Sequence, residues 1–237
     1  MNPEQKTDWG RFLLPLLFHL SVSELSAFFL GKMTGQGTAG SSDTAAVGLA
    51  SAVCIPVFLL WLSRWSLSAG KTDSPAAGSP GRPAEMRQKR RCRRWTAAAP
   101  FAGAGLSVLW GILSGFLHLS DHFSDQTQQQ LYAAPLVLQI VVLAVLSPVC
   151  EELLFRGLLF RQLKLSAGEE KSAVIVSLIF ALYHGNPIQM LYAFPMALIL
   201  QLFARKTRSL VPPVLLHAAA NLTSVLVQSL FIPSVFQ

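Results

Sequence analysis

The sequence contains little charge. Of its 237 residues, only 13% are Asp, Glu, Lys or Arg, whereas 52% are hydrophobic. A soluble domain usually carries about 25% charged residues. The deficit therefore excludes an ordinary soluble domain and predicts an integral membrane protein, whose helices each need about 20 apolar residues to cross a bilayer.

Cysteine is also scarce, because the chain has only Cys54, Cys92 and Cys150. An odd number of cysteines without a CxxC pair argues against a disulfide framework and against a zinc knuckle. A small-residue cleavage site is missing after the first apolar segment, which favours an uncleaved helix over a signal peptide. The net charge of +7 is explained by basic cytoplasmic loops, so we expect no nucleic-acid partner.

The apolar segments predict an all-α, polytopic transmembrane bundle of about seven membrane helices. We expect these helices near residues 9–30, 44–65, 96–119, 132–163, 172–185, 187–204 and 209–232. The one clear linker runs from Ser66 to Arg94; its first half is rich in Gly, Pro, Ser and Ala, and its second half is basic. We interpret the basic half as a solvated cytoplasmic loop, with nucleic-acid or specific lipid binding as alternatives.

The predicted division of the chain follows this linker. Residues 1–95 would hold two N-terminal membrane helices and the basic cytoplasmic linker, and residues 96–237 a core made of the remaining predicted membrane helices. Placing the N-terminus in the cytoplasm puts all of the 19 basic residues except Lys32 on the inner side. This bias fits the positive-inside rule, and it predicts a multi-pass protein, of the bacterial inner membrane in our preferred interpretation.

Two adjacent carboxylates and an arginine interrupt one of the apolar segments. Glu151, Glu152 and Arg156 directly follow the apolar run 132–150, and apolar sequence resumes at 158–160. A charge at the centre of a bilayer costs about 2.5–3.5 kcal/mol on insertion scales. A chain tolerates this cost mainly where the charges serve a site.

Two other predicted helices carry polar residues at a similar depth. His184 ends one apolar run, and His217 and Asn221 lie within the last helix. At about 1.5 Å per residue, Glu151, His184 and His217 lie roughly 15, 20 and 14 Å from the basic residues that mark the inner edge. These depths are near the middle of a hydrocarbon core about 30 Å thick. A lone membrane histidine is often a hydrogen-bonded packing residue, and we interpret His19 in this way.

Helical spacing suggests different roles for these groups. Glu152 and Arg156 are i and i+4, so they can pair, whereas Glu151 is rotated by about 100° and can face a cavity. A carboxylate with imidazole and amide groups suits the activation of water and the stabilisation of an oxyanion. The same groups could also bind a divalent metal, since imidazole and carboxylate are usual zinc ligands. The spacing alone does not choose between these two chemistries.

The three motifs EExxxR, FxxxH and HxxxN, in this order and each on its own membrane helix, resemble those of the CPBP intramembrane proteases. This family includes the type II CAAX prenyl endopeptidases and bacterial proteins named for abortive infection or bacteriocin immunity. The resemblance covers roughly residues 135–231. It implies that Glu151 activates water, that His184 is the second-motif histidine, and that His217 and Asn221 form the oxyanion pocket. The implied catalytic set is Glu151, Glu152, Arg156, His184, His217 and Asn221.

The resemblance implies an intramembrane endopeptidase that cleaves a membrane-anchored protein or peptide. We prefer a glutamate-type mechanism that needs no cofactor, because no extra metal ligand is evident. If a metal is present, we expect zinc held by Glu151, His184 and His217. One alternative is a non-proteolytic binding or immunity protein with the same fold. Another is a proton-coupled transporter, which the lack of inverted repeats disfavours.

Overall fold

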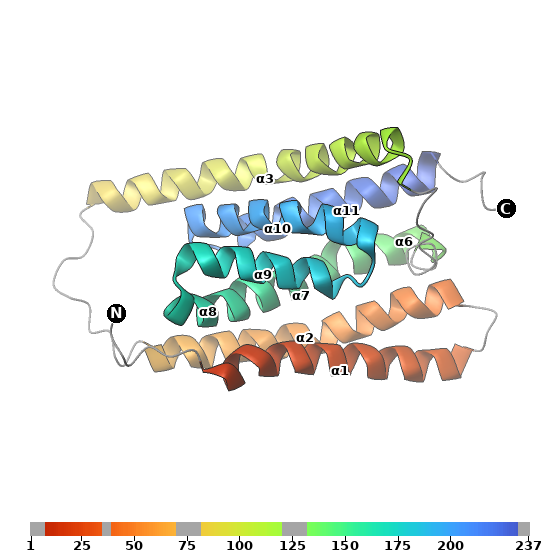
Figure 1. Ribbon diagram of the computed structural model, residues 1–237, viewed down its shortest axis with the longest axis horizontal. Helices are drawn as coiled ribbons and strands as arrows, with labels where there is room; N and C mark the ends of the chain where they lie inside the picture. Colours follow the sequence, from red (N-terminus) through yellow and green to blue (C-terminus); the bar gives the residue numbers. More distant parts are fainter. Residues whose placement is uncertain (1–7, 35–38, 70–81, 120–131, 232–237) are drawn as a thin grey trace.

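The computed structural model describes residues 8–34, 39–69, 82–119 and 132–231 (Figure 1). Within these ranges all regular structure is helical, which confirms the predicted all-α class. The elements are α1 (Trp9–Thr34), α2 (Ala39–Ala69), α3 (Arg82–Phe116), α6 (Leu136–Gln139), η2 (Ile140–Leu146), α7 (Ser147–Glu152), η3 (Leu153–Leu159), α8 (Phe160–Ala167), α9 (Glu169–Tyr183), α10 (Pro187–Thr207) and α11 (Val211–Phe231).

The elements from α6 to α8 follow one another without a break and form one long central helix. As predicted, this helix continues past the two glutamates. On one side it contacts α2, which packs against α1, and on the other it contacts α11, which packs against α3 (Figure 1). Among the described residues, six helices are long and apolar enough to cross a membrane: α1, α2, α3, the central helix, α10 and α11.

Close helix packing at one interface depends on a glycine. A Cβ atom on Gly103 of α3 would lie 2.0 Å from the carbonyl oxygen of Leu216 on α11. Ala220, one turn further along α11, is also buried at this contact. Small residues allow such an approach between membrane helices. Ala220 is one of the three alanines between His217 and Asn221, and α3 is the helix whose close approach it permits.

The helix ends that carry the basic residues gather at one end of the bundle. Arg11 of α1 lies over the ring of Trp65 at the end of α2, 5.9 Å from its centroid. Arg205 near the end of α10 pairs with Glu169 and Glu170 at the start of α9. The hydrogen bonds and charge of Arg205 lower the pKa of the exposed Glu170 carboxyl. The helix ends predicted to be on the same side are therefore neighbours, and the cytoplasmic assignment of that side stays a prediction.

The predicted loop structure of the basic segment is wrong for residues 82–94. These residues form the first turns of α3, which continues directly into a membrane span, and residues 70–81 of the expected linker lie outside the described ranges. A proline in the first turn favours this helix start. Glu85 also pairs with Lys89 one turn later, at 2.8 Å. From residue 85 onward, the arginines and lysines of this segment are exposed, as expected, but on a helix.

All seven predicted helices are present, but α9 is short. It has 15 residues, whereas a helix that crosses a bilayer needs about 20. After His184 the chain turns through Gly185, whose φ is 69°. Asn186 then caps α10 by accepting hydrogen bonds from two backbone N–H groups. The turn lies short of the far ends of α1 and α2 in Figure 1, so α9 delivers His184 partway along the bundle.

Candidate active site

The two glutamates lie on a short α-helical segment between two π-helical ones. η2 precedes α7, and η3 follows it directly after Glu152. Such π segments within α-helices are often found at functional sites, because they re-aim the side chains that follow. Nothing in the apolar sequence of the two π segments distinguishes them from α-helix, so this feature was not predictable from spacing.

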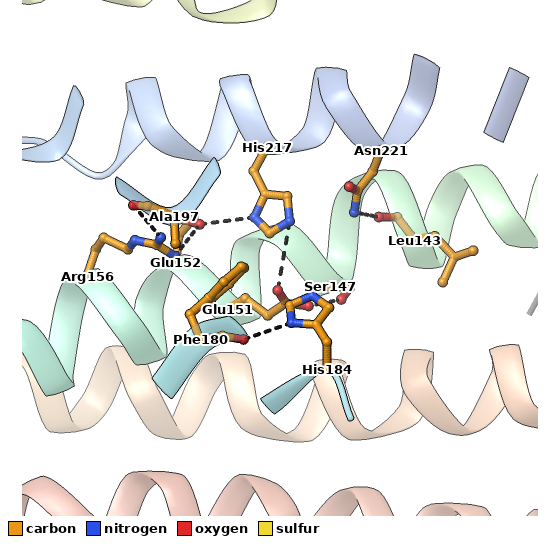
Figure 2. Close-up of polar contacts among 10 residues, drawn as sticks. All are labelled: Leu143, Ser147, Glu151, Glu152, Arg156, Phe180, His184, Ala197, His217 and Asn221. Carbon is orange, nitrogen blue, oxygen red and sulfur yellow. Dashed lines mark hydrogen bonds and ion pairs between the residues drawn. The ribbon is translucent and has the colours of Figure 1, made fainter. Parts of the chain in front are cut away.

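Glu152 is the fully buried member of the pair. Its Oε1 atom accepts hydrogen bonds from the Nη1 of Arg156 and from the Nδ1 of His217, each at 3.0 Å. The other terminal nitrogen of Arg156 donates to the carbonyl of Ala197 on α10, also at 3.0 Å (Figure 2). The predicted pairing of Glu152 with Arg156 is therefore confirmed, and it also anchors α10 and α11 to the central helix.

Glu151 has a different environment. Its Oε1 atom accepts a hydrogen bond from the Ser147 hydroxyl at 2.5 Å. Its Oε2 atom is buried without a hydrogen-bond partner among the described residues, and it lies 3.8 Å from Nε2 of His217. The Glu151 side chain keeps 12% of its surface exposed, whereas Glu152 has none. The Oε2 atom of Glu152 is also buried without a hydrogen-bond partner among the described residues, so the two carboxylates differ in that Glu152 is ion-paired with Arg156 and fully buried, whereas Glu151 is outside that pair and partly exposed.

Phe180 of α9 brings the remaining charged and titratable groups together. Its ring packs on His184 at a centroid distance of 4.9 Å and on His217 at 5.8 Å. The guanidinium of Arg156 lies over the same ring at 4.6 Å. His184 donates from Nδ1 to the carbonyl of Phe180 at 2.8 Å, which leaves Nε2 as its open nitrogen (Figure 2). The predicted convergence of Glu151, His184 and His217 is therefore observed.

The Asn221 amide makes its hydrogen bond outside this cluster. Its side-chain nitrogen donates to the carbonyl of Leu143 in η2 at 2.8 Å, away from Glu151 (Figure 2). In η2 the N–H of Ser147 bonds the carbonyl of Val142, five residues back. The next donor in this register would be residue 148, which is a proline without an N–H. Asn221 therefore satisfies a carbonyl that the backbone leaves open, a role that i, i+4 spacing with His217 did not predict.

Three residues near the site were not among the predicted site residues. Ser147 is one turn before Glu151 and could have been found from helical spacing. Tyr183 contacts Nδ1 of His19 through its hydroxyl at 3.0 Å. His19 is buried and stacks on Phe58, so it packs inside the bundle as expected. No spacing rule links α1 to α9, so this contact was not visible in the sequence.

The residues expected to hold a metal do not form a compact ligand set. Within the described ranges, the one group of three His, Cys, Asp or Glu residues with ligand atoms within 4.8 Å of one another is His19, Cys54 and Cys150. Glu151, His184 and His217 do not meet that distance, although two of their atoms approach to 3.8 Å. We therefore derive no catalytic step through a metal ion at this set.

Residues 133–223 match the family model described as type II CAAX prenyl endopeptidase Rce1-like. This region is Rce1-like. The match confirms the resemblance drawn from the three motifs, and it contains all six candidate catalytic residues. No curated protein and no solved structure matches the chain.

The match also shows which helices lie outside the Rce1-like region. α1, α2 and α3 precede the matched residues, so His19 and Cys54 are outside the Rce1-like region. Six apolar helices together with this match identify the chain as an integral membrane protein. Large apolar side chains exposed along α1 and α3, such as Leu17, Phe28 and Ile112, suit contact with lipid. The site residues lie on helices that pack inside this apolar surface.

Proposed function

We propose that this protein is an intramembrane endopeptidase that hydrolyses a peptide bond of a membrane-anchored protein or peptide. The observation that carries the proposal is the buried Oε2 atom of Glu151, which has no hydrogen-bond partner among the described residues, belongs to the carboxylate outside the Arg156 ion pair, and lies 3.8 Å from Nε2 of His217. A general base needs such an oxygen within reach of water and close to groups that stabilise charge. The Rce1-like match of the surrounding region supports this function.

We further propose that one proton lies between Glu151 and His217. His217 donates from Nδ1 to Glu152, so a neutral ring would turn the lone pair of Nε2 toward the Glu151 carboxylate. Two acceptors at 3.8 Å repel each other unless one carries a proton. The charges favour the same arrangement. Without this proton, two carboxylates and one guanidinium leave a net negative charge inside the bilayer, which is costly. We assign this proton to Nε2 of His217.

In the proposed reaction Glu151 takes a proton from a water molecule, and the water oxygen attacks the carbonyl carbon of the peptide. Once protonated, Glu151 no longer attracts Nε2–H of His217, so this donor is free to stabilise the oxyanion. The C–N bond then breaks, and the proton from Glu151 passes to the leaving nitrogen. The products are a carboxylic acid and an amine, as in hydrolysis by a general base.

The other residues position these two groups. His184 directs Nε2 into the cluster and would orient the attacking water, because its Nδ1 is fixed by Phe180. Glu152 and Arg156 hold His217 in one tautomer and one orientation. Asn221 keeps one N–H for the oxyanion while the other is bonded to Leu143. The proposed catalytic residues are thus Glu151, His184, His217 and Asn221, with Glu152 and Arg156 as positioning residues.

An apolar groove beside the site fits a membrane-anchored substrate. It has a volume of about 350 Å³, lies between α1 and α9, and is lined by Leu16, Leu20, Ile179, Leu182 and Tyr183. Leu20 and Leu182 are exposed on the outer surface, so the groove is open toward the lipid. Tyr183 lines the groove and directly precedes His184. We propose that the apolar anchor of the substrate lies here, with its peptide bond at Glu151.

The test compares the termini of membrane proteins by mass spectrometry in cells that carry the wild type, Glu151→Gln or Glu24→Gln. Glu24 is a matched control, because it is a carboxylate on membrane-spanning α1 that is exposed and outside the cluster. We expect new termini with the wild type and Glu24→Gln and none with Glu151→Gln. Immunoblots of the membrane fraction establish that all three proteins insert equally.

A peptide found in this way then serves as a substrate for purified protein. Loss of general-base catalysis lowers the rate by about 10²–10⁴-fold, and Glu151→Gln should show a fall of this size in kcat. Equal cleavage by wild type and Glu151→Gln would overturn the mechanism. A cellular phenotype that persists unchanged in Glu151→Gln, without any cleavage, would favour the non-proteolytic binding or immunity function.

A further inference from the structure

A second cluster of reactive side chains lies next to Glu151, where α1 and α2 meet α7. His19 of α1, Cys54 of α2 and Cys150 of α7 each direct one ligand atom to a common point, and these atoms lie within 4.8 Å of one another. Both cysteine side chains are fully buried, and His19 is 5% exposed. The cluster is distinct from the proposed catalytic groups and includes none of them.

The surroundings of His19 are those of a metal ligand. Its Nδ1 is held by the Tyr183 hydroxyl at 3.0 Å, and its ring stacks on Phe58. A histidine bound to a metal usually has its second ring nitrogen fixed by such a partner, which sets the tautomer and the orientation of the ring. With Nδ1 engaged in this way, Nε2 is the nitrogen left to bind an ion.

The two thiols are also close to each other. The sulfur atoms of Cys54 and Cys150 lie within 4.8 Å of one another. Both thiols are free, without a disulfide between them. Buried cysteines often serve only as small apolar residues. Two of them that meet a buried histidine from a third helix form a donor set of one nitrogen and two sulfurs, which suits zinc.

We propose that His19, Cys54 and Cys150 bind one zinc ion. On binding, each thiol releases a proton, so Zn²⁺ and two thiolates give a site without net charge. This neutrality matters inside a membrane, where an uncompensated charge costs several kcal/mol. Three protein ligands leave one coordination position for water, as in zinc sites with two cysteines and one histidine.

The proposed ion would join the two parts of the chain. His19 and Cys54 belong to helices outside the Rce1-like region, whereas Cys150 lies within it, next to Glu151. An ion on these ligands therefore fixes α1 and α2 against α7. This inference does not rest on the proposed protease function, since binding can be measured in Glu151→Gln as well as in the wild type.

The test measures zinc in purified protein that carries a histidine-free affinity tag, in detergent, after dialysis against a zinc buffer. We expect one zinc ion per chain in the wild type, in Glu151→Gln and in Cys92→Ser. Cys92 of α3 is the matched control, because it is the one cysteine outside the cluster. Cys54→Ser and Cys150→Ser should lose the ion. Tyr183→Phe should weaken binding by about 10–100-fold, the usual effect of removing a group that holds a ligating histidine.

A spectroscopic measurement on the wild type alone guards against variants that fail to fold. Cobalt in place of zinc should give the intense near-ultraviolet absorption of a thiolate–cobalt bond, and X-ray absorption at the zinc edge should show two sulfur neighbours and one imidazole. Neighbours limited to oxygen and nitrogen would overturn the proposal. So would zinc that stays in both Cys54→Ser and Cys150→Ser, no zinc in the wild type, or a Cys54–Cys150 disulfide in protein isolated without reductant.

Discussion

The imidazole of His217 lies between the two glutamates: its Nδ1 is 3.0 Å from Glu152, and its Nε2 is 3.8 Å from Glu151. One ring thus joins the carboxylate that is ion-paired with Arg156 to the carboxylate outside that pair. The first contact orients the ring, and the second places its outer nitrogen at the proposed site of reaction. Glu151 and Glu152 should therefore respond differently to the same substitution.

Glu152→Gln should destabilise the protein. The change leaves the buried guanidinium of Arg156 without its counter-charge, and breaking a buried pair in this way costs about 3–5 kcal/mol. Thermal unfolding in detergent, followed by the fluorescence of a thiol-reactive dye or by circular dichroism, should show a clear fall in melting temperature. Activity should fall as well, because His217 loses its orienting partner.

Glu151→Gln is the companion variant, and it should abolish cleavage while the melting temperature stays equal to that of the wild type or rises. Its Oε2 atom has no hydrogen bond to lose, and a neutral amide is less costly in a buried site than a carboxylate. If the two variants were equally destabilised, the separation of the two carboxylates into an ion-paired and a reactive one would be wrong.

Arg156→Lys tests geometry at constant charge. Arg156 donates in two directions, to Glu152 and to the carbonyl of Ala197, and it lies over the ring of Phe180. A single ammonium group cannot reproduce this planar arrangement, and one lost hydrogen bond to a buried acceptor costs about 1–3 kcal/mol. We expect a lower melting temperature and reduced activity.

Arg205→Lys provides the control for this substitution. Arg205 also pairs with carboxylates, those of Glu169 and Glu170, but these are exposed. Exposed ion pairs contribute about 0–1 kcal/mol, so the melting temperature should change little. An Arg156→Lys variant as stable and active as Arg205→Lys would show that charge alone is needed at residue 156.

Much of the fold and part of the site could be predicted because the membrane imposes simple rules. Apolar length located the helices, and the basic residues grouped their ends. The cost of a buried charge indicated Glu151 and Glu152 as candidate site residues, and i, i+4 spacing predicted the ion pair of Glu152 with Arg156. Each of these inferences depends either on residues that are close in the sequence or on the depth of a residue in the membrane.

The remaining features depend on contacts between distant segments or on backbone details. The basic, polar composition of residues 82–94 predicted a loop, whereas the proline in the first turn and the pair of Glu85 with Lys89 favour the helix that the structure shows. Spacing placed Asn221 with His217, but the π-helical register of η2 and the missing N–H of Pro148 direct it to Leu143. The meeting of His19, Cys54 and Cys150 requires three helices to be packed in space, and no sequence pattern contains that information.

Gly103→Ala should separate α3 from α11. The added methyl group would lie 2.0 Å from the carbonyl oxygen of Leu216, which is backbone and cannot rotate away. Overpacking of this kind costs about 1–3 kcal/mol, and displacement of α11 would also move His217. Both the melting temperature and the activity should fall. Gly105→Ala is the matched control, because a Cβ atom there meets nothing within 4 Å; equal effects of the two variants would contradict the close helix contact.

Asn221→Ala should destabilise the protein through the carbonyl of Leu143, and the size of this effect should depend on Pro148. Removal of one hydrogen bond between membrane helices costs about 0.6–1.7 kcal/mol. In a Pro148→Ala background the backbone gains an N–H five residues after Leu143, so the carbonyl has a second donor and Asn221→Ala should cost less. A double-mutant cycle of apparent unfolding free energies measures this coupling. A coupling of zero would show that Asn221 does not replace the N–H that Pro148 lacks. If Asn221→Ala then also lowered kcat, with and without Pro148→Ala, the role of Asn221 would be limited to stabilising the oxyanion.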